Sequence, residues 1–94
     1  EIKMASPSDF FKYFHMEDTD TLLIGKGPQF LHSVVVNSIS GGSVIVYDGL
    51  DATGTVVLNI PVESGVGTYV YDVRLNTGLY VVTADECDIT ITTL

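Results

Sequence analysis

The feature that most constrains this chain is a two-residue alternation of apolar and polar side chains, which recurs in short segments from residue 22 onward. It is cleanest over residues 68–75, where every second side chain is a large apolar one: Tyr69, Tyr71, Val73 and Leu75. Successive side chains of a β-strand point to opposite faces, so this pattern predicts half-buried strands.

The same alternation predicts about seven short strands at intervals of roughly ten residues, with turn-forming residues between them. We expect strands over residues 22–24, 30–37, 43–48, 55–62, 68–75, 79–83 and 88–94. This spacing is typical of an antiparallel β-sandwich or barrel, and no long helical pattern separates the strands as a parallel sheet would require. We therefore predict an all-β protein, an antiparallel β-sandwich of jelly-roll or immunoglobulin-like type.

The alternation also predicts which side chains share a face. In the second strand, it places Leu31, Ser33 and Val35 on one side and His32, Val34 and Val36 on the other. In the third strand, Val44 and Val46 are expected opposite Ile45 and Tyr47. In the last strand, we expect Ile89 and Ile91 to point inward and Thr90 and Thr92 outward.

Residues 1–21 differ from the rest and are predicted to form an N-terminal arm before a β-domain at 22–94. Ser6 before Pro7 is a plausible helix start, because serine caps helices and proline is tolerated at the first position. An extended arm is the alternative, since aromatic residues also favour strands. The arm concentrates aromatic side chains, which are our candidates for partner binding: Phe10, Phe11, Tyr13 and Phe14.

The size and the cysteine content limit the architecture further. A chain of 94 residues has room for one small core, and its single cysteine, Cys87, excludes a disulfide scaffold. No apolar run approaches the ~18 residues of a membrane helix, and no signal peptide is visible. We therefore expect no membrane partner.

The charge balance argues against nucleic acid as a partner. Twelve acidic residues face four basic ones, for a net charge of −8, and so few cations cannot neutralise a phosphate backbone. Residues 1–26 hold three lysines and five acidic residues, whereas the remainder has Arg74 alone against seven. An acidic domain facing solvent and a less acidic arm facing a partner fit this distribution.

The residues that could carry chemistry form no recognisable catalytic pattern. His15 and His32 are not spaced with Cys87 in any way that suggests a nucleophile and its base, nor a zinc site. Asp48 and Asp51 flank a glycine turn and are expected to shape it. We predict no catalytic residue, no metal ligand and no cofactor, and hence not an enzyme.

Three tyrosines leave a second interpretation open. Tyr69, Tyr71 and Tyr80 could stack on sugars, as exposed aromatics do in carbohydrate modules, or could pack in the core with their hydroxyls at the surface.

The strands and turns together resemble small β-sandwich structural proteins of tailed bacteriophages. The segments that carry the resemblance are FLHSVVVN at 30–37, YDG at 47–49, YDV at 71–73, NTGLYVV at 76–82 and DITI at 88–91. The resemblance covers residues 22–94 and rests on a pattern of strands and turns, with no catalytic signature.

The resemblance implies a capsid decoration (cement) protein, made in the host cytoplasm and bound to the outer surface of the phage head. Its implied partners are the major capsid protein and copies of itself, in an oligomer for which a trimer is common among such proteins. A tail or fibre protein, or a carbohydrate-binding β-sandwich module, is the alternative.

Overall fold

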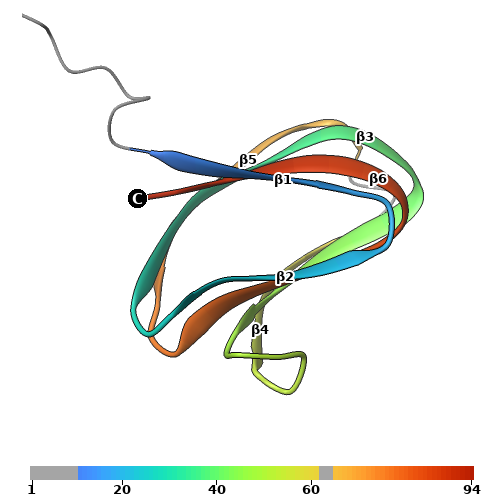
Figure 1. Ribbon diagram of the computed structural model, residues 1–94. Coiled ribbons are helices and arrows are strands. Elements are labelled where there is room, and N and C mark those ends of the chain that lie inside the picture. Colours follow the sequence, from blue (N-terminus) through green and yellow to red (C-terminus); the bar gives the residue numbers. More distant parts are fainter. Residues whose placement is uncertain (1–10, 62–64) are drawn as a thin grey trace, which may run out of the picture.

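The computed structural model describes residues 11–61 and 65–94, and the described chain is all-β (Figure 1). The strands are β1 (Lys12–Glu17), β2 (Asp20–Lys26), β3 (Gln29–Asp48), β4 (Thr55–Ile60), β5 (Gly67–Leu75) and β6 (Gly78–Thr93). They form a single antiparallel sheet of six strands. The predicted all-β, antiparallel class is confirmed. In place of the predicted seven short strands, residues 11–61 and 65–94 form six, two of which are long.

The count differs for two reasons: two predicted interruptions are bends within continuous strands, which reduces seven to five, and β1 adds a strand before residue 22. β3 runs through residues 38–42 and β6 through residues 84–87, and the two strands stay paired across both places. Gly41 and Gly42 lie between the predicted strands 30–37 and 43–48, where we expected a turn, and Gly42 lets β3 and β6 approach closely at the bend. A Cβ atom on Gly42 would lie 2.4 Å from the backbone oxygen of Ala84.

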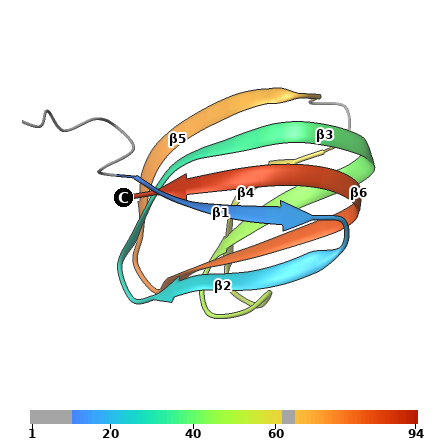
Figure 2. The ribbon, with the colours of Figure 1, turned by 45° about the horizontal axis from the view of Figure 1, so that its top comes forward.

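The bend divides the sheet into two halves. In the first, β1 and β5 flank residues 88–93 of β6 and 29–36 of β3. In the second, β2 and β4 flank residues 78–83 of β6 and 44–48 of β3. We call them the β1 half and the β2 half. Figures 1 and 2 show the sheet curling over, so that the halves face each other.

Two aspartates with a left-handed backbone conformation lie at the bend, one in the β1–β2 turn and one in the adjacent strand β6. Asp18, between β1 and β2, and Asp85, within β6, have φ angles of 56° and 59°. Aspartate tolerates this left-handed region better than most residues. The Asp18 N–H also donates to the Cys87 carbonyl at 2.7 Å, which joins the β1–β2 turn to the bend of β6.

The core fills the space between the two halves. Side chains from β1, β3, β4, β5 and β6 are fully or almost fully buried there: Met16, Leu31, Val34, Val36, Val44, Val46, Leu58, Ile60, Leu75, Leu79, Val81, Ile89 and Ile91. The predicted alternation is confirmed in β5, in the last strand and at residues 44–47.

The predicted faces of residues 30–37 are wrong, and a β-bulge is the reason. The register shifts between Leu31 and Ser33 against both β5 and β6, so the inward side changes from odd to even positions. Leu31, Val34 and Val36 are therefore all buried, while Val35 is half-buried. On the neighbouring strand, Asp72 supplies an extra residue with a φ of 48°.

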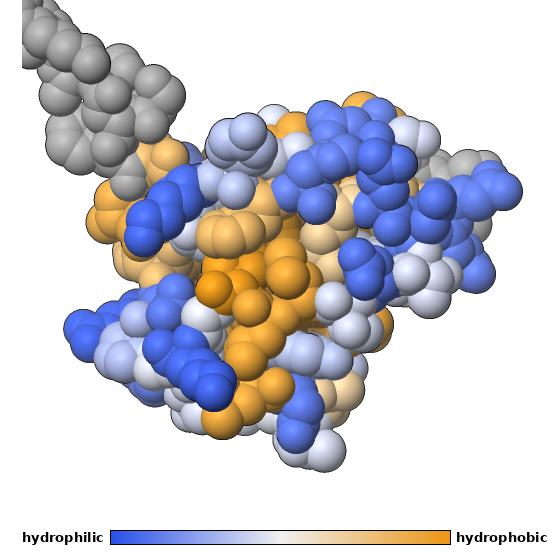
Figure 3. All heavy atoms as spheres, viewed as in Figure 1, coloured by the Kyte–Doolittle hydropathy of each residue, from blue (hydrophilic) through white to orange (hydrophobic). Residues whose placement is uncertain are grey.

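The edge strands β1 and β2 leave part of the core near the surface. They contribute the half-buried Phe14, Leu22 and Ile24, which pack against the core. Figure 3 shows a band of apolar residues through the centre of the view used in Figure 1, with hydrophilic residues on either side. Across residues 11–61 and 65–94, we find no helix that is long and apolar enough to cross a membrane.

Candidate functional site at the N-terminal strand

The second part of the predicted arm is a strand of the sheet. β1 pairs with β6 at six successive positions, from Lys12 opposite Thr93 to Glu17 opposite Asp88, without a bulge. The extended form of the arm is thus the observed one for residues 12–17. The helix proposed from Ser6 and Pro7 lies outside the described residues, as does Phe10.

The described aromatic side chains of the arm go to different places. Strand geometry sends neighbouring side chains to opposite faces, so Phe14 packs against the core while Tyr13 points away from it and is 74% exposed. Phe11 is half-buried, and its ring stacks on the His32 ring at 4.2 Å between centroids, with 15° between the planes. Phe11 and Phe14 therefore make separate contacts and do not form one aromatic cluster.

The β-bulge described above creates the platform on which Phe11 rests. His32 and Asp72 are the bulged residues of adjacent strands, and His32 Nδ1 lies 2.5 Å from Asp72 Oδ1. The contact fixes the orientation of the imidazole ring beneath Phe11. A sequence pattern cannot reveal this arrangement, because His32 and Asp72 are 40 residues apart.

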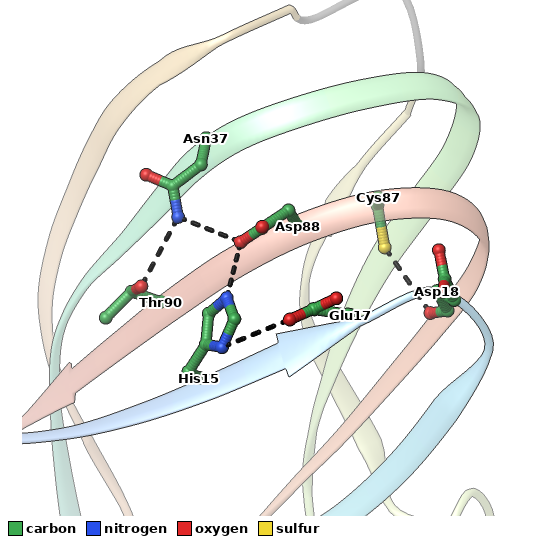
Figure 4. A network of polar contacts seen from close by, with 7 residues as sticks. All are labelled: His15, Glu17, Asp18, Asn37, Cys87, Asp88 and Thr90. Carbon is green, nitrogen blue, oxygen red and sulfur yellow. Dashed lines mark hydrogen bonds and ion pairs between the residues drawn. The ribbon is translucent and has the colours of Figure 1, made fainter.

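A second polar cluster fastens β1 to the middle of the sheet (Figure 4). His15 Nε2 lies 2.6 Å from Asp88 Oδ1, and Asn37 Nδ2 on β3 donates to the same oxygen at 3.1 Å. Asn37 also donates to Thr90 Oγ1 at 3.4 Å. The hydrogen bond from His15, and secondarily that from Asn37, lowers the pKa of Asp88 below its usual value of 3.8.

This cluster also contains the atoms of a potential metal site. His15, Glu17 and Asp88 each offer one ligand atom within 4.8 Å of the others, and zinc accepts such nitrogen and oxygen donors. However, His15 and Asp88 are at hydrogen-bond distance, closer than two ligands of one tetrahedral zinc would lie, and Glu17 Oε1 is 3.7 Å from His15 Nδ1. The observed geometry is that of a polar clamp across β1, β6 and β3.

Cys87 has the properties of a structural thiol. It is buried at the bend, and its Sγ donates to the Asp18 carbonyl at 3.5 Å. Burial is the main cause that raises the pKa of the thiol above its usual value, so the thiolate required for nucleophilic attack is disfavoured.

The carboxylates of the 48–54 loop hold turns. Asp48 accepts backbone N–H groups of Asn76, Thr77 and Gly78 at 2.8–3.4 Å, with the Thr77 bond the largest influence that lowers its pKa. Asp51 accepts the backbone N–H of Thr53 at 2.9 Å and also the Thr53 hydroxyl, which chiefly lowers the pKa of Asp51. Both therefore act as turn-forming residues, as the sequence predicted.

The three tyrosines do not form one platform. Tyr69 and Tyr71 share the inward face of β5, as predicted, and pack against the core. The Tyr69 hydroxyl donates to the Gly65 carbonyl at 2.8 Å, and burial raises the pKa of Tyr71. Tyr80 lies in the other half of the sheet, beside Tyr47 at 6.2 Å between ring centroids.

An open hollow of about 320 Å³ lies where β3 begins and β5 ends. It is lined by Pro28, Gln29, Phe30, Arg74 and Leu94. Arg74 is the one charged residue of this lining, which contains no histidine, cysteine or carboxylate side chain.

Comparison with known protein families and with curated proteins finds no match for this chain.

Proposed function

We propose that this chain is a non-enzymatic structural protein of a tailed-phage virion, a capsid decoration (cement) protein bound to the outer surface of the head. Its partners are the major capsid protein and copies of itself. It stabilises the capsid lattice by bridging neighbouring capsomers. Each contact can be weak, because repetition over the lattice multiplies the effect.

The strand order supports a jelly roll as the finer description of the fold. When the two halves of β3 and β6 are counted separately, the orders are β1–β6–β3–β5 and β2–β6–β3–β4. Folding a long antiparallel ribbon in two produces this arrangement. Jelly rolls are common in viral capsid proteins and also in lectins, so the fold is compatible with the proposal without selecting it.

The observation that carries the proposal is the way in which β1 presents Tyr13. Six ladder positions, the His15–Asp88 contact and the Phe11–His32 stack all fasten this edge of the molecule. Tyr13 projects from the fastened strand with 74% of its surface exposed. A tyrosine carried by a fixed strand has only its two side-chain torsions to order on docking, and tyrosine is enriched among residues that dominate binding energy.

The chemistry of the remaining candidates favours a structural role. The thiol of Cys87 is buried with a raised pKa, and the carboxylates of Asp48 and Asp51 are engaged by backbone groups of the turns that they hold. These groups are committed to the fold. They are poorly placed to act as nucleophile, acid or base.

A particle-binding assay tests the proposal. Purified protein is added to phage heads that lack it, and bound protein is measured together with the temperature at which the heads release DNA. We expect saturable binding and a higher release temperature. Tyr13→Ala should weaken binding at least about tenfold, the range of a hot-spot residue.

The matched control is Val70→Ala, which trims another exposed apolar side chain of the β1 half, 60% exposed on β5. It should bind as the wild type does. Failure of the wild-type protein to bind heads, or equal loss in both variants, would contradict the proposal.

The second candidate is a tail-fibre or carbohydrate-binding module, which the outward-facing Tyr47–Tyr80 pair favours. It predicts saturable glycan binding that Tyr80→Ala abolishes. A glycan array without signal removes this candidate, whereas a signal lost in Tyr80→Ala would replace the capsid proposal.

A further inference from the structure

The outer face of the β2 half is apolar, unlike the outer face of the β1 half. Register places two rows across its four strands: Leu23, Tyr80, Tyr47 and Val56, then Thr21, Val82, Ile45 and Asn59. We call these eight residues the tyrosine face. Their neighbours in sequence on β3 and β6, such as Val46 and Val81, are the ones buried in the core.

The two halves differ sharply in charge. No residue of the tyrosine face is charged, and the charged residues of its strands, Asp20, Lys26 and Asp48, stand at strand ends. The β1 half instead carries charged side chains on its strands, with Glu17 and Asp88 paired at the end next to the bend and Asp72 within β5. The acidic chain thus keeps one broad sheet surface free of charge.

We propose that the tyrosine face is the surface through which two copies of this chain associate. This inference deepens the part of the proposed function that concerns copies of itself, and rests on that part, whereas capsid docking is assigned to Tyr13. Two sheet faces can pack at about 10 Å, as layers of a folded domain do. A two-fold axis then places each row against the same surface of the partner.

Charge selects a second copy as the occupant. The chain has a net charge of −8, so two copies repel each other unless they meet where carboxylates are absent, and the tyrosine face meets that condition. A basic partner would instead bind where acidic side chains complement its charge, and the tyrosine face contains no acidic residue.

The size of the face sets the expected strength of association. Four strands about 4.8 Å apart and five residues at about 3.4 Å each give a projected area on the order of 300 Å². Two copies would bury about twice that, well below the ~1,200 Å² of a standard interface. We therefore expect weak association, with a dissociation constant of about 100 µM. A capsid surface would strengthen it by holding copies close together.

Sedimentation velocity on the isolated protein tests this inference without any capsid. We expect the wild-type chain to associate reversibly as its concentration rises through about 100 µM, and more strongly in about 500 mM than in about 50 mM NaCl, because salt screens the mutual repulsion. A wild-type protein that remains monomeric up to about 1 mM would overturn the inference.

Two substitutions on β6 form a matched pair. Val82→Asp places a charge in the centre of the tyrosine face and should weaken association at least about tenfold. Thr90→Asp places the same charge on the same strand, in the outward face of the β1 half, and should leave association unchanged. Equal association of folded Val82→Asp and wild type, or equal loss in both variants, would refute the assignment.

A milder variant covers the case in which Val82→Asp fails to fold. Tyr80→Ser removes the ring but adds no charge, and circular dichroism checks that the strands persist. It should also weaken association. A folded Tyr80→Ser protein that associates as the wild type does would refute the assignment, and neither result bears on head binding through Tyr13.

Discussion

At the residue scale, acidic side chains of this chain fall into those that bind backbone or polar groups and those that only face solvent. Asp48 belongs to the first kind, because its carboxylate holds the β5–β6 turn at the end of β3 through the N–H groups of residues 76–78. The Asp88 carboxylate similarly accepts hydrogen bonds from the side chains of His15 and Asn37. The net charge therefore does not reveal that Asp48 connects segments 28 to 30 residues apart.

This distinction predicts a pH dependence of stability. The pKa of Asp48 is lowered in the folded protein, so its contribution to stability is present above the usual pKa near 3.8 and is lost as pH falls through the lowered value. Asp48→Asn should lower Tm at pH 7, and the difference from wild type should shrink as pH falls below about 4.

The control for this measurement is Asp85→Asn. Asp85 is exposed, its Oδ atoms accept no hydrogen bond within the described part of the chain, and asparagine tolerates its left-handed φ. Thermal melts at several pH values should leave this variant close to wild type. A constant deficit of Asp48→Asn at every pH would show that the turn does not depend on the charge.

At the element scale, β1 joins two roles in adjacent residues. Phe14 faces the core and Tyr13 faces solvent, so the strand both covers an edge of the core and presents an exposed tyrosine, the residue to which we assign docking in our proposal. Phe14→Ala should lower the free energy of unfolding by about 2 kcal/mol, the cost of losing a partly buried ring. Tyr13→Ala should change it by less than about 0.5 kcal/mol.

Urea denaturation of the two variants separates the roles. Similar destabilisation by both would mean that β1 does not alternate as described. Stability of both near wild type would mean that β1 is not held in the sheet.

The bend is the other element on which the fold depends. A Cβ atom on Gly42 would meet the Ala84 carbonyl, so Gly42→Ala should destabilise the protein by about 1–3 kcal/mol, the usual cost of overpacking. Ser43→Ala, at the next position of β3, should cost less than about 0.5 kcal/mol. Denaturant midpoints of the two variants provide the test, and equal midpoints would argue against close strand approach at residue 42.

At the scale of the whole molecule, local patterns predicted strands better than their connections. The alternation correctly placed Tyr69, Tyr71 and Val73 on one face, because strand geometry is local, and the structure shows that this face packs against the core. The bend at residues 38–42 was predicted to be a turn or loop, because glycines occur both in turns and in bent strands. Only the pairing with β6 distinguishes a bent strand from a turn. The bulge at His32 likewise depends on two neighbouring strands.

The candidate site shows the same limit. The aromatic residues of the arm were visible in the sequence, but the contacts that fasten them join His15 to Asp88 across 73 residues and Phe11 to His32. The sequence also contained a signal for the tyrosine face, which was missed because we assigned faces by alternation alone. The runs at 22–24 and 44–47 are apolar at every position, as expected of strands covered on both faces.

We propose that this acidic, curled sheet is a component of the phage head surface. A cryo-EM map of the native particle tests it most directly. We expect density of this fold on the outside of the head, repeated with the capsid lattice, with the Tyr13 edge against the major capsid protein. Density of this fold at the tail alone, or none anywhere on the particle, would contradict it.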